Sequence, residues 1–253
     1  AYYTPSLPIT WDRMEYVEGT NEYIPIQPEY KKSINQLYAE AEKQALDGNP
    51  EALVNVKKEF GGNPYELKNI LKHWIRAPKD NDLKVIPTDS IVIKVDKEAV
   101  RRSGMMIPGD SIPDYMHISL KGKRALYKSE LMMLEMLSEA NWERPIYIAV
   151  SVGRENQRNM ENHFVQEGLA YRFTPFDTSK TGVTIDSEKM YDNLMNKFKF
   201  GGIDKPGIYI DENAMRMCHS HRRIFSQLVQ QLMREGKKDK AKAALDYAEK
   251  MIP

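Results

Sequence analysis

Residues 146–150, with the sequence Ile-Tyr-Ile-Ala-Val, decide the fold class that the sequence predicts. Pro145 separates them from a helix, and a short continuous apolar run is typical of a strand buried on both faces. Residues 157–167 read as a helix, and residues 169–174 alternate apolar and polar side chains. Strand, helix and strand at this spacing predict a βαβ unit, with two parallel strands joined by a right-handed crossover.

Around this unit we expect one small α/β sandwich over residues 85–183. Residues 91–95 are rich in β-branched side chains, and residues 116–121 alternate as a half-exposed strand does. Between them, Asp96 is expected to cap a short helix that ends at Gly104.

The amino-terminal part is expected to be helical. Residues 29–80 contain three amphipathic stretches in which apolar residues recur every three to four positions, separated by Gly-Asn-Pro breaks. Residues 1–28 carry four prolines and five aromatic side chains without strand alternation. They predict an extended segment that wraps over the domain surface. A belt of aromatic residues at a membrane interface is the alternative interpretation.

Helices also fill the carboxyl-terminal part, residues 187–253. Within it, residues 224–253 predict two antiparallel helices that approach closely through Ala241 and Ala248. This spacing is typical of a tetratricopeptide hairpin, with Val229 at the position of the usual close-packing glycine. The predicted class is therefore a mixed α+β and α/β protein.

The composition excludes several classes of protein. The chain has 253 residues, of which 41% are hydrophobic and 29% charged, and its formal net charge is +1. Global disorder is excluded, and the basic excess of a nucleic-acid-binding protein is absent. No apolar run approaches the roughly 20 residues that span a bilayer. The single cysteine, Cys218, cannot form an intrachain disulfide.

The candidate binding site lies in the loop of residues 153–158, between the predicted buried strand and the helix after it. This is the edge of an α/β sheet where ligands bind. The loop begins at Gly153, Asn156 would cap the helix, and Arg154 and Arg158 would add positive charge near the helix amino terminus. A small anion or a sugar phosphate fits this pattern, and an ordinary capped turn with solvated arginines is the alternative.

Other chemistry has less support from the sequence. Cys218, His219 and His221 cluster, but 219 and 221 point about 200° apart on a helix, and two ligands do not make a zinc site. We therefore expect no metal and no cofactor. The chain lacks the glycine-rich phosphate-binding signatures and the GxSxG elbow, so the sequence identifies no catalytic residue.

Six stretches of the sequence carry a resemblance to a known family. They are 141–150 (NWERPIYIAV), 6–12 (SLPITWD), 166–172 (QEGLAYR), 190–202 (MYDNLMNKFKFGG), 209–213 (YIDEN) and 236–253. In these stretches the chain resembles the carboxyl-terminal soluble part of a large Bacteroidetes family of multi-spanning membrane proteins of unknown function. The resemblance covers most of the chain from residue 85 onward and its first 28 residues.

The amino-terminal half of that family resembles protein O-mannosyltransferases. The resemblance implies a domain on the periplasmic side of the inner membrane, with the glycosyl-transfer carboxylate in the membrane-embedded half. No catalytic residue of the family therefore transfers to this sequence. The implied partners are the protein's own transmembrane region, acceptor proteins and a lipid-linked sugar, without nucleic acid.

Three functions follow as hypotheses. The first is a non-catalytic periplasmic domain that positions an acceptor protein or stabilises the membrane part. The second is a self-contained sugar- or anion-binding domain that uses residues 153–158, and the third is a scaffold that binds a protein through its terminal helices. The start at Ala1, without Met, leads us to expect that membrane-spanning helices precede this chain.

Overall fold

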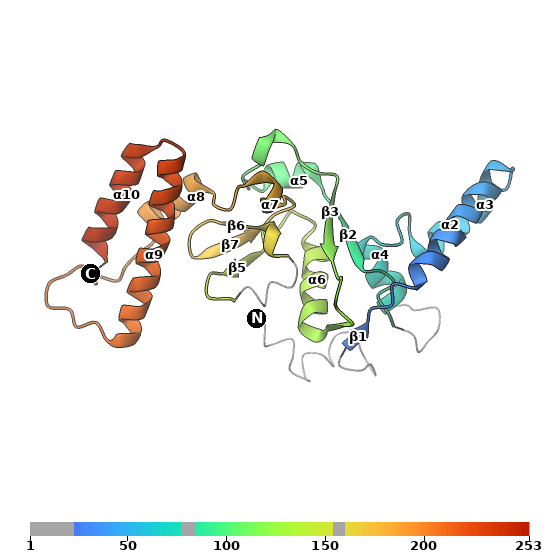
Figure 1. Ribbon diagram of the computed structural model, residues 1–253, viewed down its shortest axis with the longest axis horizontal. Helices are drawn as coiled ribbons and strands as arrows, with labels where there is room; N and C mark the ends of the chain where they lie inside the picture. Colours follow the sequence, from blue (N-terminus) through green and yellow to red (C-terminus); the bar gives the residue numbers. More distant parts are fainter. Residues whose placement is uncertain (1–22, 77–83, 154–159, 253) are drawn as a thin grey trace. The chain divides into compact units, whose positions relative to one another are not determined.

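The chain folds into a mixture of helices and small sheets (Figure 1). This computed structural model describes residues 23–76, 84–153 and 160–252. The mixed class predicted from the sequence is confirmed, as are its helical amino-terminal part and its carboxyl-terminal helical hairpin.

The described residues form two compact units. The first consists of the residues up to Gly104 together with Ile112–Arg144, and the second of Met105–Ser111 together with the residues from Pro145 onward. The expected α/β domain of residues 85–183 is therefore shared between the two units.

The first unit contains a hairpin of two helices. Its first helical elements are α2 (Tyr30–Leu46), α3 (Pro50–Phe60), α4 (Leu67–Ile70) and the π-helical turn η3 (Leu71–Arg76). Helices α2 and α3 lie side by side (Figure 1) and bury Ala41, Val56 and Phe60 between them. The ring of Trp74 stacks on Phe60 with ring centroids 5.7 Å apart, which joins the hairpin to η3.

Two antiparallel strand pairs complete the first unit, together with two more helices. They are β1 (Tyr23–Pro25) with β4 (Ala125–Tyr127), β2 (Ser90–Lys94) with β3 (Tyr115–Ser119), α5 (Lys97–Arg102) and α6 (Lys128–Ala140). The expected alternation of buried and exposed side chains along β3 is confirmed: Ile118 is buried and lies opposite Ile91, whereas His117 is exposed. Asp96 caps α5 by accepting a 2.9 Å hydrogen bond from the Ala99 N–H. Strand β1 forms part of the segment expected to be extended, and the rest of that segment lies outside the described residues.

The second unit contains a three-stranded sheet with the order β5-β7-β6, preceded by the 3-10 turn η4 (Pro108–Asp110). Its strands are β5 (Tyr147–Ala149), β6 (Phe164–Gln166) and β7 (Ala170–Phe173). Both neighbouring pairs are antiparallel.

The predicted βαβ unit is therefore wrong. In the part of residues 157–167 that the structure describes, a 3-10 turn, η6 (Glu161–His163), leads into β6 instead of a helix. Gly168, at φ 135°, then reverses the chain within three residues, so β6 and β7 form an antiparallel hairpin where the sequence predicts a helix followed by a parallel strand. Strand β5 lies at the edge of the sheet, and its Tyr147 and Ala149 are exposed, so it is not buried on both faces.

Helices form the rest of the second unit. They are α7 (Thr178–Thr181), α8 (Ser187–Asp192), the π-helical turn η7 (Asn193–Lys197), α9 (Glu212–Arg234) and α10 (Lys238–Met251). Helices α9 and α10 form the expected hairpin, and α9 begins twelve residues earlier than Ile224, where we expected it. Leu228, Leu232 and Ala244 are fully buried in the core of this hairpin. Its tetratricopeptide character stays a prediction.

Within the described residues, no helix combines the length and apolar character needed to cross a membrane.

Candidate functional site

Helix α6 ends in a turn that is unusual for its residue types. Asn141 (φ 44°) and Trp142 (φ 66°) both lie in the left-handed region. Asparagine tolerates this region, whereas a bulky side chain there costs on the order of 1–3 kcal/mol. The indole N–H of Trp142 donates a 2.8 Å hydrogen bond to the carbonyl oxygen of Lys94, and Trp142 is only 8% exposed. This buried contact holds Trp142 in its strained conformation.

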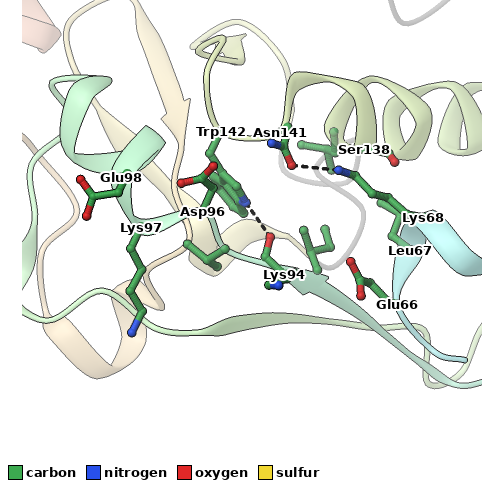
Figure 2. Close-up of a pocket in the computed structure, with 13 residues that line it drawn as sticks. Glu66, Leu67, Lys68, Lys94, Asp96, Lys97, Glu98, Ser138, Asn141 and Trp142 are labelled. Carbon is green, nitrogen blue, oxygen red and sulfur yellow. Dashed lines mark hydrogen bonds between the residues drawn. The ribbon is translucent and has the colours of Figure 1, made fainter. Parts of the chain in front are cut away.

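The strained turn borders an open pocket in the first unit (Figure 2). Its volume of about 460 Å³ lies within the range of small-molecule sites. The lining comes from the start of α4, the end of β2, the start of α5 and the end of α6. Besides the turn, its polar side chains are Glu66, Lys68, Lys94, Asp96, Lys97, Glu98 and Ser138.

Charges of both signs surround this pocket. The Nζ of Lys68 donates a 2.9 Å hydrogen bond to Oδ1 of Asn141, and Figure 2 shows these side chains pointing toward each other. The ammonium group of Lys94 and the carboxylates of Glu66 and Glu98 belong to the same lining. A ligand with donors, acceptors and charges of both signs, such as a polypeptide segment, complements this mixture better than a single anion does.

Of the four binding residues predicted from the sequence, Gly153 is within the described chain. Arg154, Asn156 and Arg158 lie outside the described residues, so their proposed role stays a prediction. Gly153 lines a second pocket, of about 550 Å³, which is formed entirely by the second unit. The loop therefore starts beside a pocket, although the described part of the helix expected to follow it is the 3-10 turn η6 and strand β6.

The second pocket lies between the three-stranded sheet and α9. Its polar lining includes Gln166 and Tyr171 from the sheet and Arg223 and Gln227 from α9. The sequence reasoning missed these residues, because the contact between the sheet and α9 joins segments about 60 positions apart. Two of them, Gln166 and Tyr171, lie in the stretch QEGLAYR (residues 166–172), which the sequence had marked only through the family resemblance.

The same stretch supplies a buried ionic cluster beneath the sheet. Glu167 and Arg172 are 5% and 1% exposed. Glu167 accepts a 2.9 Å hydrogen bond from the Tyr147 hydroxyl, and its Oε1 lies 3.3 Å from Nζ of Lys189 and 3.6 Å from Nη1 of Arg172. Asn193 donates a 2.7 Å hydrogen bond to the Glu167 carbonyl oxygen.

This cluster also changes the chemistry of Tyr147. Burial, and then the hydrogen bond to Glu167, raises the pKa of its hydroxyl. The hydroxyl therefore stays protonated and continues to donate to Glu167 in neutral solution. Tyr147, Glu167 and Asn193 come from three of the stretches on which the resemblance rests, so these stretches meet around the buried Glu167.

The cysteine–histidine cluster is divided between different environments. Cys218 is buried in the hairpin core, whereas His219 is exposed. Nδ1 of His221 lies 2.7 Å from the Met217 carbonyl oxygen, and its ring meets Phe200 edge to face. In the described parts of both units, no three His, Cys, Asp or Glu side chains are placed to hold a metal ion.

Comparison with known proteins identifies one family. The TMEM260-associated domain 2 family matches residues 1–193, a range that also includes residues 29–80 and stops before α9. No curated protein and no solved structure matches the chain. TMEM260 is an O-mannosyltransferase-like membrane protein, so the resemblance to a domain of a membrane glycosyltransferase-like protein is supported. Because the match covers well over half of its residues, the chain belongs to the TMEM260-associated domain 2 family.

Proposed function

We propose that this chain is a non-catalytic periplasmic domain of a membrane-embedded glycosyltransferase-like protein. Its role is to position the acceptor protein by holding a polypeptide segment in the pocket beside Trp142. The sugar-transfer chemistry then belongs to the membrane-embedded part of such a protein, which also binds the lipid-linked sugar.

The strained Asn141–Trp142 turn is the observation that carries this proposal. Backbone strain persists where the surrounding structure enforces it, and it concentrates at functional sites. Here the strain fixes the wall of a pocket whose mixed charges complement a polypeptide. The pocket also lies entirely within the residues that match the family, which connects it with a glycosyltransferase-like protein.

The test uses the full-length membrane protein with the double substitution Lys68→Glu and Lys94→Glu. We expect glycosylation of a folded acceptor protein to fall about tenfold or more, because reversing two charges disrupts electrostatic complementarity. Transfer to a peptide of a few residues should stay unchanged, because such a peptide does not need a positioning domain. Mass spectrometry of both products measures the two rates.

The matched control is Lys238→Glu with Lys242→Glu, which reverses two exposed charges on α10. We expect the control to glycosylate both acceptors like the wild type. Equal losses with protein and peptide would contradict a positioning role, and unchanged transfer to the folded protein would remove the pocket from the proposal.

A further inference from the structure

The pocket between the three-stranded sheet and α9 has no part in the positioning role proposed above, which involves only the pocket beside Trp142. It contains mainly uncharged side chains that can donate or accept hydrogen bonds, above an apolar floor that includes Val150, Phe164 and Ile185. Its volume of about 550 Å³ is sufficient for a small ligand.

Gln166 is the buried anchor of this pocket. It is only 3% exposed, and its Nε2 donates to the carbonyl oxygen of Gly168 at 3.0 Å and to Oε1 of Gln227 at 3.2 Å. The second hydrogen bond fixes the orientation of the Gln227 amide. Since Oε1 of Gln227 faces Gln166, its amide N–H groups are directed away from that contact and remain available to a ligand.

Other lining groups also have unused hydrogen-bonding capacity. Among the residues that the structure describes, the side chains of Asn162, Tyr171, Thr178, Thr184 and Arg223 form no hydrogen bond or ion pair with one another or with the rest of the unit. The ring of Tyr171 is half-buried and likewise has no aromatic partner in the described chain. One flat apolar face and several polar groups therefore converge on one space.

The chemistry of these groups favours a neutral ligand with many hydroxyls. Amides and hydroxyls both donate and accept hydrogen bonds, as sugar hydroxyls do. Arg223 and Glu161 carry opposite charges, so the formal charge of the lining is zero, which disfavours phosphate. The C–H face of a pyranose fits the flat Tyr171 ring, a contact that an extended peptide backbone does not offer.

We propose that the second unit binds a neutral hexopyranose unit of a glycan in this pocket, through Gln166, Gln227 and the ring of Tyr171. This site is separate from the pocket beside Trp142 and does not depend on the role proposed for that pocket.

The test uses isothermal titration of the whole 253-residue chain with methyl glycosides of glucose, galactose, mannose and N-acetylglucosamine. Inorganic phosphate and trialanine amide serve as the anion and peptide probes. We expect at least one glycoside to bind. Gln227→Ala should weaken that binding about threefold to tenfold, because it removes one or two hydrogen bonds to the ligand.

Gln230→Ala is the matched control, since it removes the same side chain type from an exposed position one turn further along α9. This variant should bind like the wild type, and thermal unfolding of both variants verifies that they are folded. The proposal is overturned if no glycoside binds, if phosphate or the peptide binds more tightly than every glycoside, or if both variants weaken binding equally. Trp142→Phe, in the other pocket, should leave the glycoside affinity unchanged.

Discussion

At the scale of single residues, His163 is a histidine whose protonation the fold opposes. Burial lowers its pKa, an effect that the nearby negative charge of Asp177 partly offsets. In the described structure, its Nδ1 is buried without a hydrogen-bond partner. The ring lies 6.3 Å from that of Phe173, so a charged imidazole would have to form in a largely apolar setting.

We therefore expect the stability of the second unit to fall as the pH is lowered. The folded pKa of His163 lies below its unfolded value of about 6.5, so between these two values the unfolded chain binds more protons. The stabilisation is complete above pH 6.5 and is lost as the pH falls toward the folded pKa. Urea unfolding at several pH values from about 7.5 down to about 5 should show a weaker dependence of stability on pH in His163→Gln than in the wild type. The exposed His219→Gln serves as the control, and equal slopes in all three proteins would refute this assignment.

At the scale of secondary-structure elements, the β6–β7 hairpin determines the direction of the sheet. Residues 164–166 are all buried, and Phe164 pairs with Phe173 across the hairpin. The turn depends on Gly168, because its φ of 135° is available almost only to glycine. Once the hairpin forms, β7 is the central strand of the sheet and pairs antiparallel with β6 on one side and with β5 on the other.

Gly168→Ala is expected to destabilise this hairpin by about 1–3 kcal/mol, since a side chain at that φ is strained. The added Cβ would make only ordinary contacts, 3.5 Å from Cζ of Phe198, so backbone strain is the main cost. Gly62→Ala, where the φ is not in the left-handed range and nothing lies within 4 Å of the new Cβ, should change stability far less. Urea midpoints measure both variants, and a Gly168 variant as stable as the wild type would contradict the argument.

At the scale of the whole molecule, the chain is organised as two units with separate hydrophobic clusters. The cluster around Phe60 belongs to the first unit, and the cluster around Leu228 belongs to the second. All three tryptophans (Trp11, Trp74 and Trp142) belong to the first unit, so tryptophan fluorescence reports the unfolding of that unit. The two units can therefore be observed separately during unfolding.

We expect Glu167→Ala to unfold the second unit early, because removing one partner of a buried ion pair costs about 3–5 kcal/mol. The loss of helical circular dichroism, to which α9 and α10 contribute strongly, should shift to lower temperature, while the fluorescence transition should move far less. Glu249→Ala, an exposed glutamate on α10, is the control. If both signals shift together in Glu167→Ala, the two units unfold as one.

The sequence alone determined the elements whose signal is local. The amphipathic periods of α2, α3 and α10, the Asp96 cap and the alternation in β3 all depend on residues within a few positions of each other. The candidate loop was located only in part, since Gly153 borders a pocket and its three partner residues lie outside the described chain.

Only the tertiary structure decided the strand directions, the ionic cluster around Glu167 and the two pockets. The predicted helix over residues 157–167 is wrong where the chain is described, because Phe164–Gln166 forms a short buried strand, and so short a run fits a strand as well as a helix. The contacts of Glu167 with Tyr147 and Asn193 join positions 20 and 26 residues apart, and Gln166 meets Gln227 across 61. Contacts over such separations depend on how the elements pack, and a pattern of neighbouring residues carries no record of that packing.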